Sequence, residues 1–126
     1  MIAARSLRFR WVVIAAYSVL LIIVALLPAR LAAHGPDFPD WISHAVAYGL
    51  QSGLIYWGLI PVFGWRGAMT GAILGTIVFG AATEVLQFLR PGRSVEFKDL
   101  AADAGGAVIV CLAIIVVSRS LSGGER

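Results

Sequence analysis

Apolar residues run along the chain in four long stretches that are separated by short polar connections. The stretches cover about residues 11–27, 41–63, 67–89 and 100–117. At about 1.5 Å per residue, helices of these lengths can cross a hydrocarbon core about 30 Å thick, with tilt or local thinning where needed. The pattern therefore predicts an all-α fold, an integral membrane bundle of four transmembrane helices that forms a single domain over residues 1–126.

Composition agrees with this fold. The chain is 60% hydrophobic and 13% charged, with a mean hydropathy of +0.88. Soluble domains are about half apolar and about a quarter charged, so a soluble core of this size would lack the polar side chains to cover it. The net charge of +3 comes from short basic clusters between apolar runs. Without a continuous basic face, nucleic acid is not an expected partner.

The distribution of basic residues predicts an orientation. With the amino terminus inside, the inner side holds Arg5, Arg8, Arg10, Arg66, Arg119 and Arg126, and the outer side holds Arg30, Arg90, Arg93 and Lys98. Six against four favours both termini in the cytoplasm. Arginine outnumbers lysine nine to one, which is typical of GC-rich bacterial genomes. We therefore expect a multi-pass protein of the bacterial inner membrane.

Small residues indicate how the third stretch packs. Gly67, Gly71 and Gly75 recur every four positions and form a bare stripe on a helix, which lets a neighbouring helix approach closely. We expect this stripe to serve packing within the chain. The same stripe could instead form a contact in a homo-oligomer.

Polar residues gather at one side of the membrane. They lie at the start of the second stretch, at the end of the third, in the following loop, and at the start of the fourth. These positions share one interface, and ionisable groups there should face one another because contact with lipid is costly. The candidate binding residues are Asp40, His44, Tyr48, Glu84, Gln87, Arg90, Arg93, Asp99 and Asp103.

Several chemistries fit these residue types. His44 and Glu84 are candidate catalytic residues, as an acid–base pair. Arg90 and Arg93 could grip a phosphate or lipid headgroup. The histidine and acidic residues could bind a metal, but their spacing matches no zinc or calcium motif, so no metal and no cofactor is predicted. The acids could also simply pair with the basic residues and hold the helices together.

The motifs in residues 40–107 resemble those of the VanZ-like membrane proteins. Their signature is similar to D-K-x-x-H-x-x-x-Y, E-x-x-Q, P-G-R and D-x-x-x-N-x-x-G. The matching positions here are Asp40, His44, Tyr48, Glu84, Gln87, Pro91, Gly92, Arg93, Asp99 and Gly106. Two positions depart from the signature, with Trp41 in place of the lysine and Asp103 in place of the asparagine. The resemblance implies a small bacterial multi-helix membrane protein associated with reduced susceptibility to glycopeptides, and no defined reaction.

We therefore expect a polar site at the outer membrane interface that binds a cell-envelope lipid or a phosphate headgroup and affects glycopeptide susceptibility. The expected partners are membrane lipids and a lipid-linked envelope precursor. One alternative is a membrane hydrolase or transferase that acts on a lipid-linked substrate. Another is a non-catalytic accessory subunit that packs against other helices.

Overall fold

The computed structural model describes residues 2–27, 39–90 and 96–123 in three helices. These are α1 (Ile2–Leu26), α3 (Asp40–Phe88) and α4 (Phe97–Gly123). Each of the three is long and apolar enough to cross a membrane. Together they are consistent with a multi-pass membrane protein.

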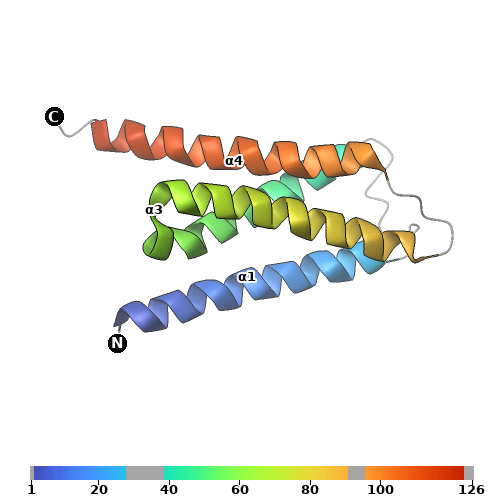
Figure 1. Cartoon of the computed structure of the whole chain (residues 1–126), viewed down its shortest axis with the longest axis horizontal. Coiled ribbons are helices and arrows are strands. Elements are labelled where there is room, and N and C mark those ends of the chain that lie inside the picture. Colours follow the sequence, from blue (N-terminus) through green and yellow to red (C-terminus); the bar gives the residue numbers. More distant parts are fainter. Residues whose placement is uncertain (1, 28–38, 91–95, 124–126) are drawn as a thin grey trace.

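The expectation of four transmembrane helices is wrong, because the described residues form three. The stretches predicted at residues 41–63 and 67–89 both belong to α3, which has 49 residues. No loop separates them. Helical backbone continues through Pro61, and only Gly64 within α3 leaves helical geometry, with φ 64° and ψ −179°. At that single residue the helix reverses, so that its first arm (residues 40–63) runs beside its second arm (residues 65–88) (Figure 1).

Glycine is required at this bend. A side chain at such a combination of φ and ψ would clash with the backbone, and the region is populated almost only by glycine. The neighbouring Phe63 and Trp65 are exposed, as expected for aromatic residues at a membrane interface. The chain thus reverses at Gly64 alone, where the sequence pattern predicts a connecting turn.

The helix α3 lies between α1 and α4 (Figure 1). Three side-chain hydrogen bonds join α1 to the first arm of α3. Arg10 donates to the Trp57 carbonyl (2.6 Å), Tyr17 donates to the Ala47 carbonyl (3.0 Å), and Gln51 Nε2 donates to Ser18 Oγ (2.8 Å). Such bonds are favourable between helices in lipid because little else there can satisfy polar groups.

Close packing holds α4 against the first arm. A Cβ on Gly106 would collide with the backbone of Ala45, and a Cβ on Gly49 would lie 2.9 Å from Val110 Cγ2. Further along, Ser52 and Cys111 are fully buried, and their Oγ and Sγ atoms lie 3.2 Å apart. The two backbones approach closely only because glycine occupies both contact points.

The glycine stripe packs within α3. Added Cβ atoms would meet Phe63 at Gly67 (2.8 Å), Leu59 at Gly71 (2.7 Å) and Ile55 at Gly75 (3.8 Å), all on the first arm. The expectation of packing within the chain is therefore confirmed. The predicted span at residues 100–117 is also longer than expected, since α4 covers Phe97–Gly123.

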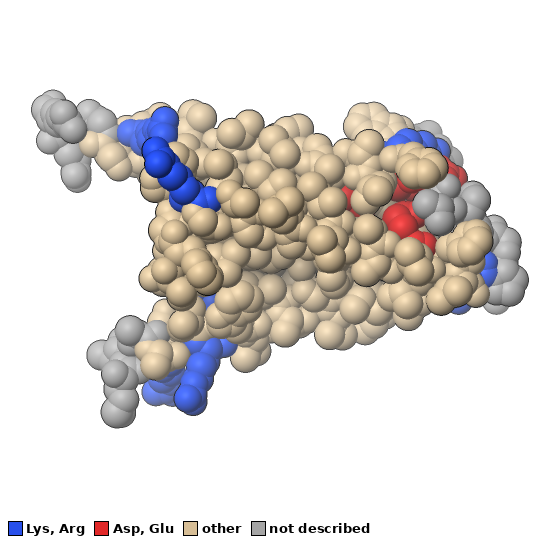
Figure 2. Space-filling model, in the orientation of Figure 1, with Lys and Arg blue, Asp and Glu red and all other residues tan. Residues whose placement is uncertain are grey.

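The molecule has two chemically different ends. At the bend end, α1 begins, α3 turns at Gly64 and α4 ends (Figure 1). At the polar end, α1 ends, α3 begins and ends, and α4 begins. Figure 2 shows acidic side chains at the polar end, whereas the surface between the two ends is free of charge on the face in view. This uncharged band fits a hydrocarbon core, and the polar end fits a membrane interface.

Candidate functional site

Three helical segments meet at the polar end and contribute the candidate residues. His44 and Tyr48 come from the first turns of α3, Glu84 comes from its last turns, and Asp99 and Asp103 come from the first turns of α4. The reversal of α3 at Gly64 explains how residues 40 positions apart on one helix come together. Acidic side chains in the first turn of a helix, such as Asp99, are also favoured by the helix dipole.

The central contact joins His44 to Asp103. The two atoms, His44 Nδ1 and Asp103 Oδ1, are 2.9 Å apart. Asp103 is fully buried, whereas the His44 side chain is 19% exposed. When Asp103 accepts this hydrogen bond as a carboxylate, Nδ1 is the donor, and a neutral imidazole then has its lone pair on Nε2. That second nitrogen lies 4.0 Å from Asp99 Oδ2.

Gly80 makes room for the buried carboxylate of Asp103. A Cβ added at Gly80 would lie only 2.7 Å from Asp103 Oδ2. The second arm of α3 therefore approaches α4 at a point where it has no side chain. Any larger residue at Gly80 would have to displace Asp103 and with it the hydrogen bond to His44.

Glu84 and Asp99 complete a compact group with His44. A ring nitrogen of His44 and one carboxylate oxygen from each acid lie within 4.8 Å of one another. Glu84 is 3% exposed and Asp99 is 9% exposed. Within the described ranges, Glu84 Oε1 and Asp99 Oδ1 are buried without a hydrogen-bond partner. Both acids thus present an unsatisfied oxygen, which is uncommon for buried polar atoms.

Tyr48 packs against the ring of His44. Its ring is stacked on that of His44, with centroids 5.7 Å apart and planes 10° apart. Its hydroxyl is 2.5 Å from Thr83 Oγ1, and Thr83 donates its own proton to the Gly80 carbonyl (2.8 Å). Tyr48 must therefore be the donor to Thr83. These contacts hold the Tyr48 ring in place against the His44 ring.

Thr83 is not among the site residues predicted from the sequence. It is fully buried and contacts Tyr48. Tyr48 belongs to the polar cluster, which we define as His44, Tyr48, Glu84, Asp99 and Asp103. The position of Thr83 four residues before Gln87, on one face of a helix, was a usable signal. Threonine in an apolar helix usually bonds its own backbone, however, as Thr83 also does.

The remaining candidates lie further out. Gln87 is buried, Asp40 is exposed in the first turn of α3, and Arg90 is half-buried after the end of α3. Arg93 lies outside the described residues, as does Arg30. Lys98 pairs with Glu96, with Nζ and Oε2 2.6 Å apart. In the described part of the chain, no lysine or arginine forms an ion pair with Glu84, Asp99 or Asp103.

The arrangement can bind a ligand or move a proton at Nε2 of His44. This atom is oriented by Asp103 and faces two acids whose oxygens are not fully used. The structure therefore brings together His44, Tyr48, Glu84, Asp99 and Asp103, and gives His44 a closer partner, Asp103, than the Glu84 expected from sequence.

No protein family model, no curated protein and no solved structure matches this chain. The resemblance to VanZ-like proteins thus rests on the motif residues alone and stays a prediction. Because a fold alone does not define a function, the chemistry of the site is the basis for the proposed function.

Proposed function

We propose that the protein is a bacterial inner-membrane protein whose polar end binds the phosphate-bearing headgroup of a cell-envelope lipid. The supporting observation is a cluster of buried acids around the partly exposed His44, at one end of a largely apolar surface. A lipid is amphipathic in the same sense, since its headgroup reaches the interface while its chains stay beside the helices. In line with the VanZ-like motifs, binding of an envelope precursor would affect glycopeptide susceptibility.

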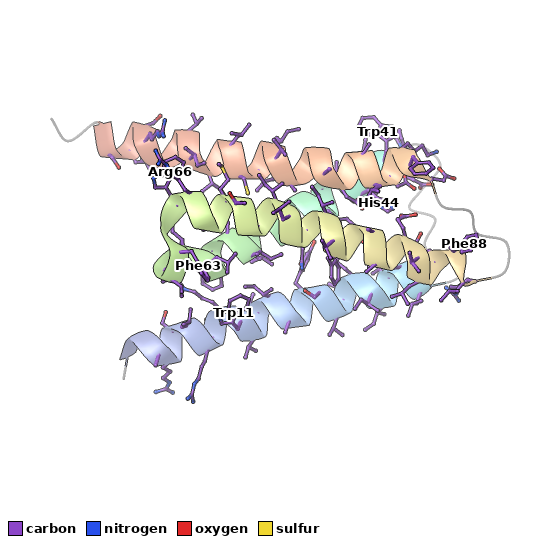
Figure 3. The ribbon with its side chains drawn as sticks, in the orientation of Figure 1. Trp11, Trp41, His44, Phe63, Arg66 and Phe88 are labelled. Carbon is purple, nitrogen blue, oxygen red and sulfur yellow. The ribbon has the colours of Figure 1, made fainter. Side chains whose placement is uncertain are left out.

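Exposed apolar side chains lie at the same end of the molecule as the polar cluster (Figure 3). Trp41, Phe88 and Leu89 are at least half exposed, and Phe97 is 83% exposed. Trp41 and Phe88 lie at the same end of the molecule as His44 (Figure 3). Side chains of this kind belong to the boundary between headgroups and acyl chains. A lipid docked there would have its chains against these residues and its headgroup beside His44.

Basic residues at the same end supply attraction for a phosphate. Arg90 follows α3 directly, Arg93 lies in the same connection by sequence, and Lys98 is exposed in the first turn of α4. Arginine binds phosphate through paired N–H donors. In the proposed orientation both termini are cytoplasmic, so this end faces the outer side, where envelope precursors are used.

Mass spectrometry of co-purified lipids tests the binding. Full-length protein and the Arg93→Ala variant are purified in the same detergent, with Arg119→Ala at the bend end as the matched control. We expect the variant to retain about tenfold less of one phosphate-bearing lipid, the effect of losing one charged hydrogen bond. Equal recovery of the same lipids from all three proteins would contradict the proposal.

Cysteine labelling tests the orientation. Cys111 is the only cysteine in the sequence and it is fully buried, so added cysteines can be labelled selectively. In intact cells, a membrane-impermeant maleimide should label Lys98→Cys at the polar end and spare Ser120→Cys at the bend end. The reverse pattern would overturn the outward placement of the site.

A second candidate function is a hydrolase or transferase acting on a lipid-linked substrate. The observation that favours it is the 2.9 Å contact of His44 with the buried Asp103, the arrangement of an oriented general base. Incubation with lipid phosphates and diphosphates, followed by assay of released inorganic phosphate, separates the two functions. Turnover that disappears in His44→Gln supports the enzyme, and binding without turnover supports the first proposal.

A further inference from the structure

Two buried acids at the polar end, Glu84 and Asp99, form no ion pair with a lysine or arginine of the described residues. Glu84 and Asp99 are each more than nine-tenths buried, and each holds one buried oxygen without a hydrogen-bond partner in the described part of the chain. His44 lies 4.0 Å from Asp99 Oδ2 and within 4.8 Å of a Glu84 oxygen. Ionised carboxylates in such a place are costly unless a positive charge lies beside them, so this pair of acids is suited to binding a cation.

We propose that His44, Glu84 and Asp99 bind a divalent metal ion. Their donor atoms lie within 4.8 Å of one another. Ligand atoms about 2.0 to 2.2 Å from a tetrahedral ion lie about 3.3 to 3.6 Å apart, so the most widely separated of the three donor atoms need to approach by up to about 1.5 Å. Glu84 has enough side-chain torsions to make this adjustment. The sequence spacing hides the site because the three ligands come from three different segments.

The contact between His44 and Asp103 has the form of an outer-shell interaction in metal sites. A metal-binding histidine usually donates its second ring N–H to a carboxylate, which fixes the ring and its tautomer. Here Nδ1 donates to Asp103 at 2.9 Å, and Nε2 is left as the ligand atom, 4.0 Å from Asp99. Asp103 is thus a positioning residue, and Gly80 leaves the space that it needs.

The ligand set indicates which ion fits. One imidazole nitrogen with two carboxylate oxygens suits Mn²⁺ or Zn²⁺, and a charge of +2 balances Glu84 and Asp99. Three protein ligands leave coordination positions open. An open position could take a phosphate oxygen, which would explain how an acidic cluster accepts an anionic headgroup. This last consequence rests on the proposed function, whereas the metal site itself does not.

Electron paramagnetic resonance tests metal binding without any lipid substrate. Full-length protein is stripped with a chelator and titrated with Mn²⁺, and the loss of the free-ion signal reports binding. We expect one Mn²⁺ per chain, displaced by Zn²⁺.

Glu84→Gln and Asp99→Asn should each weaken the affinity at least about tenfold. The control is Glu96→Gln, an exposed acid at the same end, which should leave the affinity unchanged. Absence of binding by the wild type up to about 1 mM would overturn the proposal.

Two further variants test the positioning role and guard against simple misfolding. Asp103→Asn and Gly80→Ala should bind Mn²⁺ about 10- to 100-fold more weakly, although neither removes a ligand. Gly75→Ala is the matched control for Gly80→Ala, because its added Cβ would make only an ordinary 3.8 Å contact. Each variant is first checked for an unchanged thermal unfolding transition. Wild-type affinity in folded Asp103→Asn would refute the assigned geometry.

Lipid capture with and without metal separates the two proposals. If lipid retention depends on Arg93 but the protein binds no metal, the metal site is refuted and the proposed function stands. If one Mn²⁺ binds through Glu84 and Asp99 but no lipid is retained, the metal site stands and the proposed function is refuted.

Discussion

The two ends of the molecule manage charge in opposite ways. At the bend end the described charges are arginines, and three of them lie over aromatic rings. The Arg10 guanidinium lies 4.8 Å from the Trp57 ring, while those of Arg66 and Arg119 lie 5.0 and 5.6 Å from the Trp65 ring. At the polar end Glu84, Asp99 and Asp103 are buried and depend on contacts between helices. A charged side chain that is exposed at the membrane interface costs little free energy, and its position indicates the orientation of the helix. A buried charged side chain needs a specific partner, and its position indicates a functional site.

Substitution of Gly106 with alanine should give the largest effect and break the polar end. The added methyl would collide with the backbone of Ala45, so α4 would have to move away from α3. We expect the free energy of unfolding to fall by about 1–3 kcal/mol or more, measured by circular dichroism in detergent. The adjacent Gly105→Ala is the control, because a Cβ there meets nothing within 4 Å. Equal losses in both variants would contradict the close approach of α4.

Substitution of Gly64 with alanine should destabilise the bend end by a comparable or smaller amount. A non-glycine residue at φ 64° and ψ −179° is strained by about 1–3 kcal/mol. The exposed Thr70→Ala on the same helix is the control and should not change the unfolding free energy. Since Gly64 is far from the polar cluster, folded Gly64→Ala should keep the same Mn²⁺ affinity as the wild type. A loss of affinity without a loss of stability would contradict the independence of the two ends.

Arg10→Ala should have a smaller effect at the bend end. The variant loses the hydrogen bond to the Trp57 carbonyl and the contact with the Trp57 ring. Together these should lower the unfolding free energy by about 1–2 kcal/mol. Arg8 is exposed and provides the control, since Arg8→Ala should leave stability unchanged. Identical melting of both variants with the wild type would show that α1 is held mainly by its apolar contacts.

Ser52→Ala should have the smallest effect. Its hydroxyl donates to the Ala107 carbonyl at 3.4 Å, a long hydrogen bond between α3 and α4. Hydrogen bonds between membrane helices average about 0.6 kcal/mol, and a loss of this size or less is expected in the unfolding free energy. Ser118→Ala, which removes a bond within α4 only, serves for comparison. A loss well above 1 kcal/mol would mean that Ser52 carries more of the interface than its geometry indicates.

Much of the site could be predicted from the positions of polar residues along apolar stretches. Depth alone places His44, Glu84, Asp99 and Asp103 at one end, and the structure brings these four together. Depth does not fix which faces meet, however. The choice of Asp103 over Glu84 as the hydrogen-bond partner of His44 depends on Gly80, whose missing side chain lets α4 approach there.

The number of helices could not be predicted from the same pattern. Hydropathy marks where apolar residues stop, and the apolar residues around Gly64 are interrupted by the charged Arg66. Such an interruption predicts a turn between two helices. A helix can nevertheless reverse at one glycine without a loop, since only two backbone torsions need to change. Such an event leaves almost no trace in the spacing of apolar residues.

The order of α3 and α4 along the chain also sets the order in which the polar end can be assembled. During synthesis both arms of α3 emerge before α4, so His44 and Glu84 reach the membrane interface ahead of Asp99 and Asp103. Until α4 docks, the imidazole has no carboxylate on Nδ1 and Gly80 faces an unfilled gap. Docking of the last helix therefore completes the fold and the polar cluster in one event, and a chain cannot acquire either without the other.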